Sequence, residues 1–209
     1  LAGKKMALGF GGSFYSGSVR NDTENYYTDN GNGFTRNSSA ENIGFHAKRE
    51  YFGANLQLEY DNTFGKTIFK AEYVGGQQPG IAATDGVRGP QASQSFAQTP
   101  AGDLYLRDFS GHYIWLTQQI AKSRFTALLA YDAYDPNVNI GENEIGTLSN
   151  STAGDIKFST IGYGLTYVPN SRIKFTLYNE HVMNGATQLP GYTADLKDDV
   201  FTARLQYRW

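Results

Sequence analysis

The chain lacks cysteine altogether and contains no long run of apolar residues. Without cysteine it can form neither a disulfide framework nor a thiolate metal site, although this absence fixes no cellular compartment. A membrane-spanning helix needs about 18 or more consecutive apolar residues, and the longest largely apolar segment, 125–131, is far shorter. Neither a disulfide-stapled domain nor a helical membrane anchor is therefore expected.

The chain also has little excess charge of either sign. Its 18 Lys and Arg residues stand against 20 Asp and Glu residues, which gives a formal net charge of −2. This balance argues against a nucleic-acid-binding protein, which would carry a basic patch. The mean hydropathy of −0.48 is typical of a soluble chain. However, strands that alternate apolar and polar residues give a low average even when one of their faces is entirely apolar.

Glycine and aromatic residues are abundant instead. The 209 residues include 24 Gly, 15 Tyr and 13 Phe. Tyr and Phe favour strands, and Gly favours turns over helices. The length suffices for one domain with a sizeable core, so the composition predicts a single all-β domain.

The final segment, 198–209, alternates between apolar and polar residues from Phe201 onward. Its apolar parity ends in Tyr207 and Trp209, whereas the opposite parity carries Arg204 and Arg208. Period two over a whole strand gives one apolar and one polar face. If this strand crosses a bilayer, Arg204 must face inward, because an arginine facing lipid at the midplane costs roughly 2–4 kcal/mol. The alternative is an edge strand of a soluble sandwich.

The same alternation predicts about eight strands along the chain. Their expected ranges are 4–17, 43–60, 66–75, 104–120, 124–134, 156–168, 172–181 and 198–209. In the second strand the apolar parity changes, which predicts a β-bulge near 50–53. In the fourth strand the outward face is ambiguous, because Tyr113 and Trp115 compete with Ile114 and Leu116.

Long polar loops and tight turns alternate strictly between these strands. The loops are expected at 18–42, 76–103, 135–155 and 182–197, and the turns at 61–65, 121–123 and 169–171. A soluble sandwich has no reason to place every long connection at one end, whereas an outer-membrane barrel has short periplasmic turns and long external loops. The fold class predicted for residues 1–209 is therefore all-β: an antiparallel transmembrane β-barrel, or the C-terminal part of one.

Four passages carry a resemblance to a known family. They read FGANLQLEYDNTFGKTIFKAEYVGG at 52–76, RDFSGHYIWL at 107–116, LLAYDAYDPN at 128–137, and GYGLTYVPNSRIKFTLYNEHV at 162–182 together with the ending FTARLQYRW. These passages resemble the C-terminal half of outer-membrane porins, most closely the phosphate-selective porin O and P family of Bacteroidetes-type bacteria. The resemblance implies a larger barrel of about 16 strands, homotrimers, and anion-selective pores with basic lumen residues.

The charged residues on the inward parity are the candidate functional residues. The expected pore-lining residues are Lys70, Glu72, Asp132, Arg172, Lys174, Glu180, Arg204 and Arg208. Rings of basic side chains favour anions, and mixed rings give weak selectivity. Alternatively, opposite charges pair across neighbouring strands and only brace the barrel.

Other candidate sites are weaker, and no catalytic, cofactor or metal site is predicted. The histidines, His46, His112 and His181, have no serine at a spacing that marks a hydrolase. The stretch 22–33 offers oxygen ligands for Ca²⁺ but lacks the order of an EF-hand loop. Arg107 and Asp108 are interpreted as an ion pair at the rim.

These observations predict a porin of the bacterial outer membrane that lets small hydrophilic solutes or anions diffuse through a charged lumen, without a cofactor and without chemistry. The expected partners are outer-membrane lipid, the solutes, and the barrel-assembly machinery, which the C-terminal strand would engage. The alternative is a non-conducting barrel that serves as a structural anchor or binds a partner through its long external loops.

Overall fold

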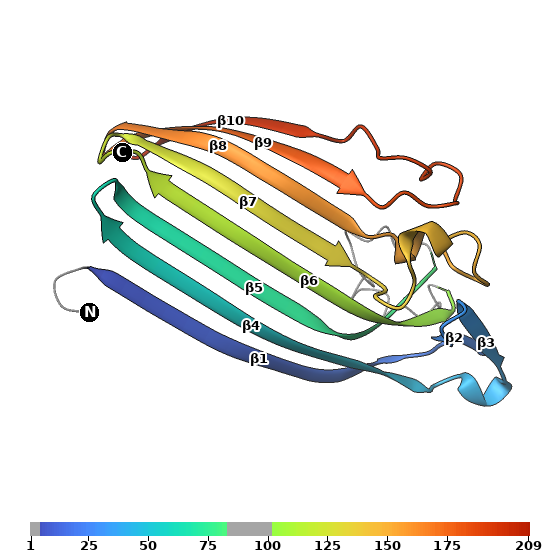
Figure 1. Ribbon diagram of the computed structural model, residues 1–209. Helices are drawn as coiled ribbons and strands as arrows, with labels where there is room; N and C mark the ends of the chain where they lie inside the picture. Colours follow the sequence, from blue (N-terminus) through green and yellow to red (C-terminus); the bar gives the residue numbers. More distant parts are fainter. Residues whose placement is uncertain (1–4, 83–101) are drawn as a thin grey trace.

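The computed structural model describes residues 5–82 and 102–209, and in this part of the chain the fold is all-β. Eight long strands follow one another in a single antiparallel sheet, each paired with the next (Figure 1). They are β1 (Met6–Arg20), β4 (His46–Asn62), β5 (Gly65–Gly80), β6 (Leu104–Gln119), β7 (Phe125–Asp135), β8 (Phe158–Asn170), β9 (Ile173–Asn184) and β10 (Val200–Tyr207). The predicted antiparallel all-β fold is confirmed.

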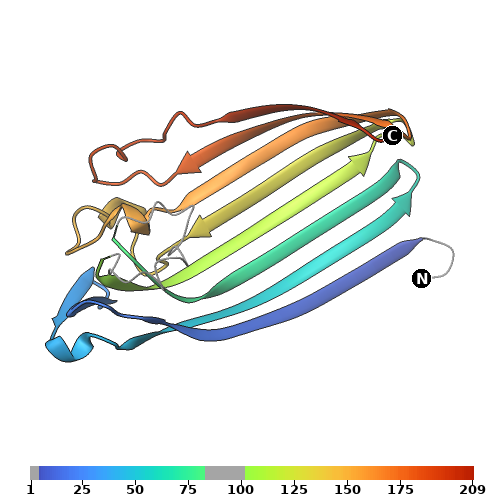
Figure 2. The same cartoon turned by 180° about the vertical axis from the view of Figure 1, so that it is seen from behind.

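The connections alternate in length, as the sequence predicts. The short ones, β4–β5, β6–β7 and β8–β9, gather at one end of the sheet, and the long ones gather at the other (Figures 1 and 2). The only helices in the described residues are three short 3₁₀ turns: η1 (Ala40–Asn42), η3 (Glu142–Glu144) and η4 (Ala153–Asp155). No described helix has the length and apolar character needed to cross a membrane.

The sheet is not closed, because β1 and β10 do not pair with each other. No second sheet packs against it in the described part of the chain (Figure 2). Phe175 and Leu205, which would lie inside the dry core of a sandwich, are 44% and 64% exposed. The described residues therefore form one curved sheet with two accessible faces rather than a sandwich.

A β-hairpin occupies much of the segment that the sequence predicts as the first long loop, 18–42. Strands β2 (Asn25–Asp29) and β3 (Phe34–Ser38) pair with each other, and β2 also pairs in parallel with the start of β6. The Asn-Gly pairs at 30–33 between these short runs are a strong hairpin signal that the loop prediction overlooked. Most of the predicted second loop, 76–103, lies outside the described residues, although β5 extends to Gly80.

The predicted β-bulge near 50–53 is wrong. β4 pairs with β1 without a register shift from Arg20↔His46 to Met6↔Tyr60. The parity change in the sequence has another cause. Phe45 precedes the strand and stacks on Tyr26 with ring centroids 5.1 Å apart. Ala47 is an apolar residue on the concave-face parity because Val19 and Leu104 bury this position.

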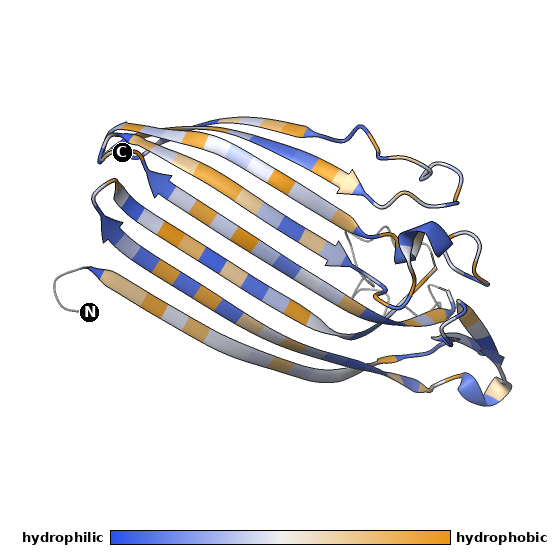
Figure 3. Cartoon of the chain, in the orientation of Figure 1, coloured by the Kyte–Doolittle hydropathy of each residue, from blue (hydrophilic) through white to orange (hydrophobic). Residues whose placement is uncertain are grey.

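The continuous register sorts the side chains of all eight strands onto two faces, since directly paired residues share a face. One face is apolar, and the alternation of hydrophilic and hydrophobic residues is clearest along β4 and β5 in Figure 3. Its side chains include Phe10, Leu56, Leu129 and Leu177, of which Phe10 is 84% exposed. The register also resolves the ambiguity in β6, because Ile114 pairs with Ala71 and Tyr131 on the apolar face. Tyr113 and Trp115 therefore lie on the polar face.

The polar face is the concave one. Trp115 on β6 and Tyr178 on β9 approach to 6.0 Å between ring centroids, although β7 and β8 lie between their strands. Flat strands about 4.8 Å apart would place these two backbones roughly 14 Å from each other. On the apolar face, by contrast, the described ring contacts of the long strands join adjacent strands only, such as Phe125 with Tyr167.

The long connections pack together into a cap at their end of the sheet. We define the loop cap as residues 21–45, 81–82, 102–107, 136–157 and 185–199. Its apolar core consists of Phe34, Tyr105, Ile140, Ile145 and Ile156, with Ala82, Leu189 and Tyr192 packed against it. The core thus joins segments from four different connections.

The contact between the hairpin and residues 148–149 can be tested at Gly33. It has φ +97°, and a Cβ there would lie 2.8 Å from the backbone N of Ser149 and also meet the Ser149 carbonyl oxygen. Gly33→Ala is therefore expected to separate the hairpin from the cap, giving faster amide exchange and proteolysis across β2 and β3. Gly31→Ala is the matched control, since Gly31 has φ +79° with no atom within 4 Å. Equal protection in the two variants would contradict this packing.

Candidate functional site

The concave polar face is a surface on which charged, hydroxyl and aromatic side chains from the long strands converge. Across β5, β6 and β7 the register aligns Glu72, Tyr113 and Asp132. One row nearer to the short turns lie Lys70 and Trp115, followed by the small residues Ala130 and Gly162 and then by Glu180. This face therefore presents a mixed set of charges between aromatic rings.

Small residues on β7 and β8 create the space in which the aromatic rings lie. The Tyr178 ring lies over Gly162 and Gly164, where a Cβ at Gly164 would approach its Cδ2 to 2.8 Å. A Cβ at Gly162 would collide with the Tyr178 hydroxyl. Ala130, beside Gly162, is likewise buried. The side chains of Trp115 and Tyr178 can therefore approach each other above the small residues of β7 and β8.

Six of the eight residues predicted to line a pore lie on strands with concave-face parity. They are Lys70, Glu72, Asp132, Lys174, Glu180 and Arg204. The other two, Arg172 and Arg208, lie just beyond the strand ends, at the rim with the short turns. The Arg208 backbone N–H donates to the Arg172 carbonyl oxygen over 2.8 Å, so these two residues are neighbours.

The alternative interpretation, that these charges brace the sheet by pairing across strands, finds little support. None of the eight forms an ion pair within 4.0 Å with a described residue. The pair that does join two neighbouring strands on this face is Lys66–Glu59, at 2.6 Å. Within the described residues, these eight charges are thus not held in ion pairs with one another.

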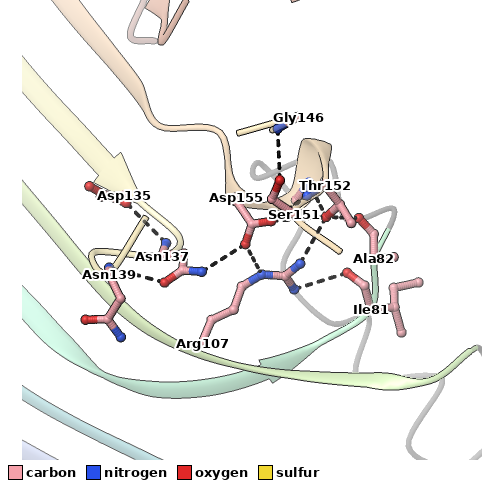
Figure 4. Close-up of polar contacts among 11 residues, drawn as sticks. Ile81, Ala82, Arg107, Asp135, Asn137, Asn139, Gly146, Ser151, Thr152 and Asp155 are labelled. Atoms are coloured by element: carbon pink, nitrogen blue, oxygen red, sulfur yellow. Dashed lines mark hydrogen bonds and ion pairs between the residues drawn. The ribbon is translucent and has the colours of Figure 1, made fainter. Parts of the chain in front are cut away.

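A buried ion pair within the loop cap joins the start of β6 to the β7–β8 connection (Figure 4). Arg107 Nε donates to Asp155 Oδ1 over 2.7 Å, and the two side chains are only 4% and 0% exposed. The predicted rim pair between Arg107 and Asp108 is therefore wrong. Consecutive strand residues point to opposite faces, and Asp108 instead accepts from Gln77 and Asn139.

The rest of the guanidinium and carboxylate are also satisfied. Arg107 donates to the Ile81 carbonyl oxygen and to Thr152 Oγ1, each over 3.2 Å. Asp155 accepts from Asn137 Nδ2 over 3.1 Å and from the Thr152 backbone N–H over 2.7 Å. One network thus fixes the end of β5, the start of β6 and the β7–β8 connection relative to one another.

Aromatic rings surround this pair on the side of the hairpin. The Arg107 guanidinium lies 4.9 Å from the ring centroid of Tyr105 and 5.5 Å from that of Phe34. Tyr105 in turn stacks on Tyr27 with centroids 4.3 Å apart. Burial is the main reason why the pKa of Tyr105 is raised to about 12. The cap therefore has a desolvated interior of its own.

The weaker candidates do not assemble into a catalytic or metal site in the described residues. His46 Nδ1 lies 3.0 Å from Ser18 Oγ, a pair that sequence spacing did not reveal, but no described carboxylate orients this ring. His181 instead contacts Asp199 at 2.7 Å. In the stretch 22–33, Asp29 Oδ1 accepts the Gly31 N–H as part of the hairpin turn. No described group of three or more His, Asp and Glu side chains could hold a metal ion.

Comparison with protein-family models, with curated proteins and with solved structures finds no match for this chain.

The buried Arg107–Asp155 pair predicts that replacing one partner destabilises the cap more than replacing both partners. Asp155→Leu or Arg107→Leu leaves one buried group without its partner, which typically costs about 3–5 kcal/mol. The expected result is loss of amide protection throughout residues 136–157. The double variant Arg107→Leu/Asp155→Leu should recover part of this protection, since an apolar pair leaves no unpaired charge.

The matched control is Lys66→Gln, which breaks the exposed pair with Glu59 and should leave protection unchanged in hydrogen-exchange mass spectrometry. Additive effects of the two single variants in the cycle would show that Arg107 and Asp155 do not act as a pair.

Proposed function

We propose that this chain forms part of the wall of an outer-membrane β-barrel of the porin type, through which small hydrophilic solutes or anions diffuse. The observation that carries the proposal is the combination of an exposed apolar face with a concave charged face on one antiparallel sheet. Transmembrane barrels alternate lipid-facing and lumen-facing residues in this way. A soluble protein rarely leaves so large a contiguous apolar surface uncovered.

The dimensions of the apolar face support this proposal. On β1 and β4 it runs from Met6 to Phe14 and from Phe52 to Tyr60, nine residues each. A transmembrane β-strand needs about 9–11 residues when tilted. Near the short turns, Phe125, Tyr167 and Phe175 are register partners in a row across three strands, as expected for an aromatic girdle at a membrane interface.

The two unpaired edges of the sheet favour a barrel that contains more strands than the eight long strands described. β1 carries no charge from Met6 to Val19 and no proline, so nothing discourages another strand from pairing with it. An open edge is not tolerated in lipid, so we propose that further strands close the barrel. About 16 strands would leave an aqueous channel, in line with the resemblance to the phosphate-selective porin O and P family.

Passage through such a channel would depend on width and charge. The loop cap would restrict access from the end with the long connections, and the buried Arg107–Asp155 network would keep it in place. Below the cap, Lys70, Glu72, Asp132 and Glu180 would bias passing ions as a mixed-charge wall. We also propose that the C-terminal strand β10 engages the barrel-assembly machinery and that the barrels associate as trimers.

The ordered cap favours one alternative function. Loops that only surround the mouth of a pore need no apolar core. In this chain, residues from four connections form a common apolar core. A non-conducting barrel that binds a partner protein through the cap would explain why the long connections are packed into an ordered structure. Conductance distinguishes the two functions directly.

The decisive experiment reconstitutes the complete, membrane-assembled protein into planar bilayers with a KCl gradient. A porin is expected to give discrete conductance steps, and the reversal potential gives its ion preference. Assembled protein that binds a partner but produces no steps would establish the alternative instead.

Neighbouring residues on β4 test the assignment of the two faces. Leu56→Arg places a charge on the apolar face and is expected to cost roughly 2–4 kcal/mol if this position lies near the midplane of the bilayer. Gln57→Arg places the same charge on the concave face and should leave the stability nearly unchanged. The measurement is urea-induced unfolding of each variant from lipid vesicles. Equal destabilisation by both variants would refute the proposed orientation.

A further inference from the structure

Basic side chains gather at the end of the sheet that carries the short turns. Eight exposed Lys and Arg residues of the described chain lie within four residues of these turns, of the start of β1 or of the end of β10. Two described acidic residues, Glu59 and Asp61, lie in the same region. The basic residues are Lys5, Lys66, Lys122, Arg124, Arg172, Lys174, Arg204 and Arg208. We call these eight residues the basic rim.

The register directs the strand residues of the basic rim to the concave side. Lys66 pairs with Asp61, and Lys174 pairs with Gln206, at positions of concave-face parity. Arg204 follows on the same parity, paired with Thr176. Apart from the Lys66–Glu59 pair, no member of the basic rim has a described carboxylate within 4.0 Å. The rim therefore presents uncompensated positive charge at this mouth.

The opposite end of the sheet is acidic. The residues of the cap and of the adjoining strand ends, 20–50, 77–82, 102–108, 135–157 and 184–199, include fourteen Asp and Glu against seven Lys and Arg. The exposed acidic residues among them are Glu24, Glu41, Asp108, Glu142, Glu144, Asp195, Asp198 and Asp199. The near-zero net charge of the chain thus conceals a strong separation of charge between its two ends.

The two ends act independently of each other in solution. β5 has 16 residues, so at about 3.3 Å per residue it separates the ends by roughly 50 Å. The Debye length is about 10 Å at 0.1 M salt and about 3 Å at 1 M. Each mouth therefore sets its own local ion concentration, with anions enriched at the basic rim and cations enriched at the cap.

We infer that this separation of charge makes the channel rectify, with the basic rim as the determinant of anion access from its side; the inference rests on the proposed porin function. When the cap side is electrically positive, anions enter from the rim and cations enter from the cap, so both enriched species move into the pore. With the opposite polarity, both are drawn out of the pore and its interior is depleted of carriers. Current is therefore larger when the cap side is positive.

The test records current–voltage curves of the complete, assembled protein in planar bilayers at 0.1 M and 1 M KCl. At 0.1 M the current ratio between the two polarities is expected to be about 2, because a mouth potential of roughly 1 kT changes local ion concentration about e-fold. At 1 M the ratio should fall towards 1. Channel orientation is set by one-sided addition and checked by proteolysis of the cap.

A variant and a matched control identify the charges responsible. Arg124→Gln/Arg172→Gln/Lys174→Gln should bring the ratio at 0.1 M close to 1, whereas Arg36→Gln, which removes a basic residue from the hairpin of the cap, should leave it at or above the wild-type value. A folded variant that keeps the wild-type ratio would overturn the role of the rim, as would a wild-type ratio of 1 at 0.1 M. Absence of any conductance would instead refute the porin proposal.

Discussion

The uninterrupted register of the antiparallel sheet is the constraint on which the rest of the structure depends. From Met6 on β1 to Tyr207 on β10 the pairing passes through eight long strands, with an irregularity only near the β8–β9 turn, between Tyr167 and Asn170. A shift of one residue would exchange the two faces of a strand. Because no other shift occurs, Phe10, Leu56 and Leu177 share one surface, and Lys70 and Glu180 share the other.

The loop cap depends on a second kind of interaction. Its segments are far apart in sequence, and they are joined by one apolar core and one buried ion pair. A buried pair is seldom a net source of stability compared with an apolar substitute, but losing one partner is costly. Arg107 and Asp155 therefore specify where the β7–β8 connection sits on the concave side rather than simply strengthening the fold.

Local patterns in the sequence sufficed for the sheet but not for the cap. The alternation of apolar and polar residues predicted all eight long strands and the alternation of short and long connections. A period of two residues can be recognised within each segment alone. The ambiguity at Tyr113 and Trp115 could not be resolved locally, since it depends on which side chains face them across β5 and β7. The partner of Arg107 lies 48 residues away, and no spacing rule relates these two positions. The β2–β3 hairpin, in contrast, could have been predicted from the Asn-Gly pairs in its turn.

The bare edge of β1 has a consequence for how the protein must be made. Fourteen residues from Met6 to Val19 offer an extended backbone with aromatic side chains and neither charge nor proline, the features that let strands from different molecules join into aggregates. Soluble sheets guard such an edge with lysines or bulges, and β1 has neither. In water such an edge favours aggregation, so under the porin proposal the nascent chain would need a chaperone that shields β1 until a neighbouring strand pairs with it in the bilayer.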